Sequence, residues 1–179
     1  GWATATRTSE RGSPRRSRLL LVSVSLPWLG HGDAHERAWQ PKMSSGEYHN
    51  LAITADGSVW NWGVGLFGRL GHGDQQAQLL PKKVAAFTGR RAVAVSAGTH
   101  HSLALTADGS AWSWGRGGDG RLGHGDEQSQ LLPKKVEALA GQRVVAVSAG
   151  GEHSLAITAD GAVWSWGDGG ECRLGHGDE

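Results

Sequence analysis

Apolar and polar residues alternate along several short stretches of the chain. In AVAVS, Val93 and Val95 share one face, and in HSLALT, Leu103 and Leu105 do the same. A period of two is typical of half-buried β-strands. No window shows apolar residues at helical spacing over a helical length. The pattern therefore predicts an all-β fold.

Turn residues separate these stretches. Ala107-Asp108-Gly109 lies between HSLALT and SAWSW and predicts a three-residue hairpin loop, with Gly109 in the left-handed conformation and Asp108 bonding the local backbone. LLPKKV, at 131–136, predicts a fourth strand. Its proline suits an edge, because proline cannot donate to a central ladder. Each unit should thus hold four short antiparallel strands.

The same unit recurs every 52 residues. RLGHGD begins at Arg69, Arg121 and Arg173, and the WxW pairs are Trp60/Trp62, Trp112/Trp114 and Trp164/Trp166. Four antiparallel strands repeated in tandem fit the blade of a β-propeller. We predict units at 46–97, 98–149 and a truncated 150–179, which amounts to about two to three blades.

The tryptophans predict how the blades associate. Each buried indole removes about 150–250 Å² from water, which is a stabilisation that one thin sheet cannot obtain alone. We therefore expect each sheet to bury its tryptophan face against a neighbouring sheet.

Composition narrows the class of function. The 179 residues include 29 glycines and nine tryptophans, and the formal net charge is +1. Residues 1–18 carry five arginines and one glutamate, so the rest of the chain is mildly acidic. We divide the chain into an irregular basic segment with a degenerate partial repeat (1–40) and the repeats (41–179). An acidic body disfavours direct nucleic-acid binding.

Compartment signals are few. The apolar run near residue 20 is shorter than the roughly 20 residues of a membrane span, and a single cysteine, Cys172, permits no internal disulfide. These features predict a protein without a membrane partner, in the cytoplasm or nucleus.

Three chemical motifs need a decision. Gly115, Gly117 and Gly120 spell GxGxxG, but turn residues and a proline follow where a phosphate-binding helix should begin. His124 and Asp126 resemble metal ligands, yet the pair recurs in every unit, whereas zinc needs about four ligands at one point. We interpret His124 and Asp126 as loop residues that bond backbone groups.

Nucleophilic catalysis is equally unsupported. His101, Ser102 and Asp108 recur with every hairpin, and nothing singles out one serine as activated. We therefore expect no catalytic residue, no metal and no cofactor in this chain.

The unit AGxxHSLALTADGxxWSWGxxxxGRLGHGD, followed by PKKV, resembles the repeat of the regulator of chromosome condensation family. This resemblance covers roughly residues 41–179 and implies seven-bladed β-propellers. The GRLGHGD wording is also similar to the propellers of large HECT-type ubiquitin ligases. The matching positions are Gly98, His101, Leu103, Leu105, Asp108, Gly109, Trp114, Gly115, Leu122, Gly123, Gly125 and Pro133.

The sequence departs from this pattern in places. His31 lies 18 residues before His49, whereas His72 lies 29 before His101, which predicts that the strand equivalent to Val93/Val95 is lost from the first unit. Val22 and Val24 are candidates to replace it. Cys172 stands where the other units have glycine, so a positive φ there would be strained. Three units cannot close a seven-bladed ring, and we expect the chain to be a fragment of a longer one.

Function is expected in the loops that differ between units, because the shared residues build the blade. These variable positions should line one rim and bind a protein partner. The candidates are Glu47, Tyr48, Thr99, His100, Gly151 and Glu152 in one set, with Arg116, Asp119, Asp168 and Glu171 in a second set that spans Val64 to Phe67 in the first unit.

The resemblance implies three functional classes. We favour a protein-interaction scaffold, with the substrate-recruiting part of a ubiquitin ligase as a candidate. Guanine-nucleotide exchange on a small Ran-like GTPase is the alternative. Ultraviolet sensing, as in the related plant photoreceptor, would need GWRHT-type motifs, and the matching GEYHN, GTHHS and GGEHS lack both Trp and Arg.

Overall fold

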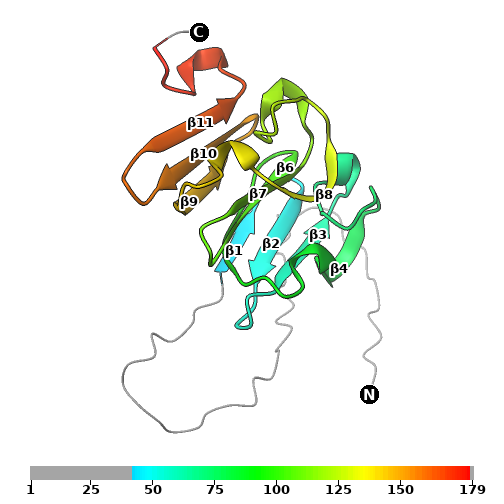
Figure 1. Ribbon diagram of the computed structural model, residues 1–179. Coiled ribbons are helices and arrows are strands. Elements are labelled where there is room, and N and C mark those ends of the chain that lie inside the picture. Colours follow the sequence, from blue (N-terminus) through cyan, green and yellow to red (C-terminus); the bar gives the residue numbers. More distant parts are fainter. Residues whose placement is uncertain (1–41, 178–179) are drawn as a thin grey trace, which may run out of the picture. The chain divides into compact units, whose positions relative to one another are not determined.

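The computed structural model describes residues 42–177, which form three antiparallel sheets (Figure 1). The first contains β1 (Lys42–Ser45), β2 (His49–Ile53), β3 (Val59–Gly63) and β4 (Gln78–Lys83). The second contains β5 (Ala92–Ala97), β6 (His101–Thr106), β7 (Ala111–Gly115) and β8 (Gln130–Lys135). The third contains β9 (Val144–Ala149), β10 (His153–Thr158) and β11 (Val163–Gly167).

The connecting segments contain only single turns of 3-10 helix. These are η1 (Leu66–Gly68), η2 (Ala85–Phe87), η3 (Gly118–Gly120), η4 (Glu137–Leu139) and η5 (Gly170–Cys172). The all-β prediction, with propeller blades of up to four strands, is confirmed.

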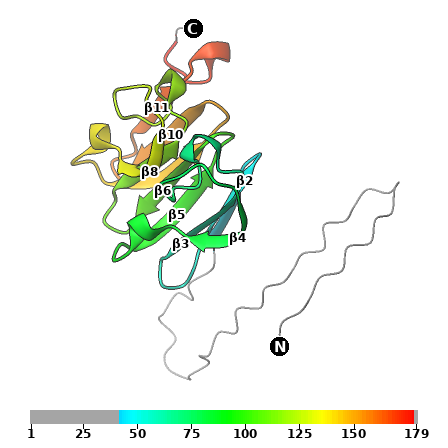
Figure 2. The same ribbon diagram turned by 90° about the vertical axis from the view of Figure 1, so that its right-hand side faces the viewer.

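Burial along the central strands shows that the sheets stack face to face (Figure 2). In β2 and β10 buried residues alternate with more exposed ones, as expected of half-buried strands. All six residues of β6 are buried, because the second sheet is covered on both faces by its neighbours. The half-buried expectation is therefore wrong for the middle sheet and right for the two outer ones.

The first sheet obtains its first strand from an unexpected segment. β1 pairs with β2, with Met43 opposite Ala52 and Ser44 opposite Leu51. The sequence KMSS thus occupies the place of Ala94–Ala97 one repeat later, and the predicted loss of this strand is wrong. An edge strand needs backbone donors and acceptors in register more than β-branched side chains, which is why hydrophobic pattern alone missed it. Val22 and Val24 lie outside the described residues.

Two apolar clusters lie between the sheets. Leu51, Ile53, Val59, Phe87 and Trp114 belong to the cluster between the first and second sheets. The cluster between the second and third sheets contains Leu105, Ala111, Val136, Leu139, Val144 and Ala156. The 3-10 turns contribute to this packing, since η2 supplies Phe87 and η4 supplies Leu139. Sheet stacking, rather than any single sheet, therefore forms the core.

The two tryptophans of a WxW pair have different environments. Trp114 is fully buried, and its ring centroid lies 5.8 Å from that of Phe87. Trp112 is half-buried, and Trp164, the first member of the third pair, is 40% exposed. The second tryptophan of a pair is thus the one that enters the interface, and the expectation of uniform burial is corrected.

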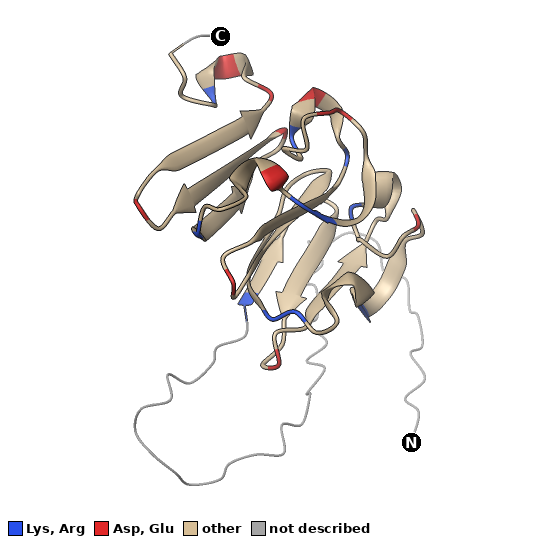
Figure 3. Cartoon of the chain, in the orientation of Figure 1, with Lys and Arg blue, Asp and Glu red and all other residues tan. Residues whose placement is uncertain are grey.

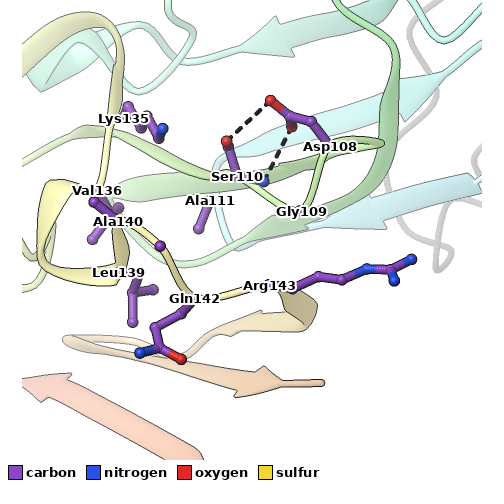
Figure 4. Close-up of a pocket in the computed structure, with 11 residues that line it drawn as sticks. Asp108, Gly109, Ser110, Ala111, Lys135, Val136, Leu139, Ala140, Gln142 and Arg143 are labelled. Carbon is purple, nitrogen blue, oxygen red and sulfur yellow. Dashed lines mark hydrogen bonds between the residues drawn. The ribbon is translucent and has the colours of Figure 1, made fainter. Parts of the chain in front are cut away.

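The hairpin loop between β6 and β7 closes at one end of the second sheet (Figure 4). Gly109 has a φ of +83°, and its N–H donates to the Thr106 carbonyl at 2.9 Å. The Asp108 carboxylate accepts from the Ser110 N–H at 3.1 Å and from the Thr106 hydroxyl at 2.6 Å. These bonds explain why the repeat has Asp-Gly at this turn.

We predict that Gly109→Val lowers the free energy of unfolding by roughly 1–3 kcal/mol more than Ser110→Val does. Only the first change forces a β-branched residue into left-handed space, and its Cβ would lie 2.9 Å from Arg143 Cγ. Chemical denaturation of the two variants provides the comparison. Equal destabilisation would contradict this account of the turn.

Candidate interaction rim

The repeat histidine and serine form a relay between adjacent sheets. His49 Nε2 lies 2.7 Å from the Ser102 hydroxyl, which donates to the Arg69 carbonyl at 2.8 Å. Trp114 Nε1 donates to the same carbonyl at 2.9 Å. The second interface repeats this arrangement with His101, Ser154, Arg121 and Trp166, at 2.9, 2.8 and 2.9 Å. One arginine carbonyl therefore joins each sheet to the next.

The relay fixes the protonation of the histidines. Because the Ser102 hydroxyl uses its single proton on the Arg69 carbonyl, the proton between His49 and Ser102 must be on Nε2. His49 Nδ1 is buried without a partner. Burial, together with the nearby Arg69 charge, lowers the pKa of His49 to about 4, and burial near Arg121 lowers that of His101 to about 3. Both rings are neutral at neutral pH.

These bonds also explain why no triad forms. His101 contacts Ser154 of the next sheet rather than its chain neighbour Ser102, whose proton points to a carbonyl. Asp108 lies at the far end of β6, in the hairpin loop. The three residues named by the sequence are thus held apart.

The GHGD segment folds back on its own sheet. His124 Nε2 lies 3.0 Å from the Ser113 hydroxyl, which donates to the Leu122 carbonyl at 2.6 Å. Asp126 accepts from the Gln128 N–H at 3.0 Å, which is the backbone contact expected of it, whereas His124 bonds a side chain instead. Among residues 42–177, no three His, Cys, Asp or Glu side chains converge in a way that could hold a metal.

The glycines of GxGxxG permit close backbone approach. Gly115 has a φ of +108°, and a Cβ on it would lie 2.6 Å from the His100 carbonyl oxygen. Gly120, at a φ of +69°, ends the single turn η3. These constraints account for the glycines without a phosphate.

A hollow of about 290 Å³ lies at the hairpin end of the second sheet (Figure 4). Asp108, Lys135, Leu139 and Arg143 are among its lining residues. The equivalent residues one repeat earlier, including Asp56 and Lys83, line a similar hollow. Because it recurs with the repeat and its aspartate is engaged in the turn, we interpret it as a consequence of blade geometry.

The variable loops gather at the opposite end of the sheets. We call these loops, at 46–48, 64–67, 98–100, 116–119, 150–152 and 168–171, the rim. Backbone bonds join the two rim loops of each sheet: Val64 to Tyr48 at 2.9 Å, Arg116 to His100 at 3.0 Å, and Asp168 to Glu152 at 3.1 Å. Arg69 Nη1 donates to the Thr99 carbonyl at 3.0 Å and so links neighbouring sheets. The two sets of candidate positions are therefore brought together.

Aromatic rings and arginines form one half of the rim. Tyr48 stacks on His100 with centroids 5.7 Å apart, and Phe67 meets the same imidazole edge-on at 5.7 Å. The Arg69 guanidinium lies 5.3 Å from the Tyr48 ring, and that of Arg116 lies 5.5 Å from Phe67. Tyr48 and Phe67 are 44% and 38% exposed. This aromatic cluster is open to a partner.

Acidic residues form the other half (Figure 3). The buried Arg121 guanidinium pairs with Asp119 at 2.5 Å and also with Glu152 of the next sheet. Arg173 pairs with Asp168 at 3.0 Å. These carboxylates are thus anchored, whereas Glu47, Gly151 and Glu171 are exposed. The rim changes from cationic and aromatic to acidic along the stack.

The rim holds strained backbone. Phe67, Asp119 and Glu171, at equivalent positions, have φ values of 61°, 59° and 60°. Cys172 follows with a φ of 55°, which is the strain that the sequence suggested for this position. Left-handed conformation is costly for a residue as bulky as phenylalanine, and such strain is concentrated at functional sites.

Sequence reasoning missed Arg69 and Arg121. Both belong to the repeated RLGHGD, so a search confined to variable positions passes over them. Their side chains nevertheless organise the variable loops, since Arg69 packs against Tyr48 and Arg121 holds Asp119. The usable signal was an arginine repeated directly after each variable loop.

Stacked four-stranded sheets joined by a repeated relay define this class of protein as a β-propeller. The regulator of chromosome condensation (RCC1) repeat model matches residues 56–105 and 108–157, more than half of the chain. A second model of the same repeat matches 92–121 and 144–171. The chain belongs to the RCC1 repeat family.

Similar proteins are considerably longer. The chain is 42% identical over 139 residues to the human E3 ubiquitin-protein ligase HERC2, and this match covers 76% of the chain and 3% of HERC2. It is 40% identical over 186 residues to the ultraviolet-B receptor UVR8 of Arabidopsis thaliana, covering 93% of the chain and 42% of UVR8.

Solved structures agree on the fold. Yeast RCC1 (Prp20) bound to Kap60 matches with a TM-score of 0.69 and 30% identity, covering 77% of the chain and 34% of that protein. Human WBSCR16 matches with a TM-score of 0.66 and 25% identity, covering 70% and 32%. Within the described residues, no helix is long and apolar enough to cross a membrane.

Proposed function

We propose that the chain is a protein-interaction scaffold that binds its partner with the rim. The aromatic cluster supports this proposal most directly, because Tyr48 and Phe67 remain exposed although each packs against His100. Aromatic residues and arginines dominate the energetic centres of protein interfaces. The strained Phe67 backbone favours the same conclusion, since an exposed loop residue gains nothing for folding from this conformation.

The relatives suggest a setting for the scaffold. Similarity to HERC2 supports a role as the substrate-recruiting part of a ubiquitin ligase, with a ubiquitination substrate as the partner. Such a role requires no catalytic residue in the chain itself. Recruitment needs only a rigid rim that holds a partner near a separate catalytic domain.

A charge-reversal pair tests the proposal. Arg116→Glu alters the aromatic cluster, whereas Lys135→Glu makes the same change at the hairpin end. We expect the first to weaken binding of captured partners by about 30-fold or more and the second to leave it unchanged. Quantitative affinity capture followed by binding measurements on the recovered proteins provides both values. Loss of binding with Lys135→Glu alone would place the interface elsewhere.

Guanine-nucleotide exchange is the second candidate. It is supported by the likeness to Prp20p of Saccharomyces cerevisiae, whose structure was reported with its binding properties to Gsp1p and histones, at a TM-score of 0.62 and 27% identity. A nucleotide-release assay with a small Ran-like GTPase separates the two functions. Accelerated release would favour exchange over the scaffold.

A further inference from the structure

The two ends of the stack expose surfaces that are buried elsewhere in the same molecule. We call the outward surface of the third sheet the tail face and that of the first sheet the head face. On the tail face, Ile157 is 42% exposed, whereas its equivalents Ile53 and Leu105 are 1% and 3% exposed. Val163 is 71% exposed, against 3% for Ala111.

The head face carries the complementary set. Ala52 is half-buried, whereas Ala104 and Ala156, its equivalents, are 0% and 1% exposed. Leu79 and Leu80 of β4 are 94% and 72% exposed, while the equivalent Leu131 and Leu132 of β8 are 37% and 53% exposed. Strand β8 obtains this cover by lying over η1 of the preceding sheet, where the Leu131 carbonyl accepts from the Gly73 N–H at 3.0 Å.

Polar groups on the two faces also match. In the existing interfaces the Arg69 and Arg121 carbonyls accept from a serine and a tryptophan of the next sheet. Among residues 42–177, the Arg173 carbonyl receives no such donor, and Trp62 Nε1 has no acceptor. The head face presents Trp62 together with Asn50 in place of the relay serine. Asparagine offers both a donor and an acceptor, so it can serve both ends of the relay.

A second contact recurs between sheets. Ser44 accepts from the Ala97 N–H at 3.0 Å, and Ser96 accepts from the Ala149 N–H at 2.9 Å. Ser148 is the next serine in this series and lies on β9, beside the small apolar hollow that Leu155, Ile157 and Val163 line on the tail face. The tail face therefore has the acceptors, and the head face the donors, of an interface that the chain already makes twice.

We propose that a second copy of this chain covers the tail face with its head face. The contact is head-to-tail, so each copy uses two different surfaces, and such contacts continue until a ring closes. Two copies bring together six sheets, which is within the four to eight blades of known propellers. The smallest closed assembly is thus a dimer with two equivalent interfaces. This inference is independent of the rim and its partner.

Complementary variants test this arrangement. Ile157→Glu places a charge on the tail face, and Ala52→Glu places one on the head face, both at positions with space in the isolated chain. Each should weaken dimerisation at least tenfold, because the charge would be buried without a partner. Ala140→Glu, an exposed position between the second and third sheets, is the matched control.

Light scattering coupled to gel filtration gives the decisive readout. We expect the wild type and the control to have twice the monomer mass and each face variant alone to be monomeric. An equimolar mixture of the two face variants should regain the doubled mass, because one intact head then meets one intact tail. That recovery also shows that both variants are folded. A monomeric wild type, or a mixture that stays monomeric, would overturn the proposal.

Discussion

Replacing Trp114 with alanine is expected to lower the free energy of unfolding by about 3–5 kcal/mol. The indole is fully buried between the first and second sheets, and its N–H donates to the Arg69 carbonyl at 2.9 Å. The variant loses buried apolar area, creates a cavity beside Phe87 and removes one donor from the carbonyl that joins the sheets. Denaturant titration followed by circular dichroism, at concentrations where the chain is monomeric, measures the loss.

Trp164→Ala is the matched control. This residue belongs to an equivalent WxW pair but is 40% exposed. Its removal is expected to cost less than half as much as that of Trp114, at roughly 1–2 kcal/mol. If both variants lose the same stability, the second tryptophan of the pair has no special place in the stack.

Stability is expected to fall steeply between pH 6.5 and pH 4. His49 and His101 are buried as neutral rings, with pKa values lowered to about 4 and about 3. The unfolded chain therefore binds protons more readily than the folded one. The stabilisation is fully present above the unfolded pKa of about 6.5 and is lost as the pH falls through the folded values. Each histidine contributes a loss on the order of 2–3 kcal/mol by about pH 4.5.

His101→Gln isolates this contribution. The amide retains a donor toward the Ser154 hydroxyl but does not titrate, so the slope of unfolding free energy against pH should decrease by about 1.4 kcal/mol per pH unit. Hydrogen bonds from Thr106 and Ser110 lower the pKa of Asp108, whose contribution is lost at lower pH, below about 4. Asp108→Asn should therefore leave the slope between pH 6.5 and 4.5 unchanged. A slope unaffected by His101→Gln would contradict the neutral relay.

Local patterns in the sequence were sufficient to predict the strands and hairpins. The alternation in HSLALT, the Asp108-Gly109 turn and the 52-residue spacing each depend on neighbours in sequence, and backbone geometry follows from them directly. β1 was missed because KMSS has no hydrophobic alternation, and its pairing with β2 depends on register with a strand already in place. Burial of Trp114 rather than Trp112 likewise depends on which face meets the preceding sheet.

The rim could be predicted only in part. Differences between repeats identified Tyr48, His100 and Arg116, which the fold brings into one cluster with Phe67. Arg69 and Arg121 were not found, because their backbone carbonyls serve the repeated relay while their side chains serve the variable loops. A residue with both roles resembles a purely structural one when only one sequence is read.

Hydrogen exchange at the Trp114 indole tests most directly whether the sheets stack through the arginine carbonyls. The Trp114 Nε1–H is buried and bonded to Arg69 of the preceding sheet, so it should exchange only through global unfolding. The Trp164 indole, in a partly exposed ring, should exchange much faster under the same conditions. Equal, rapid exchange at both positions would show that the sheets do not stack in this way.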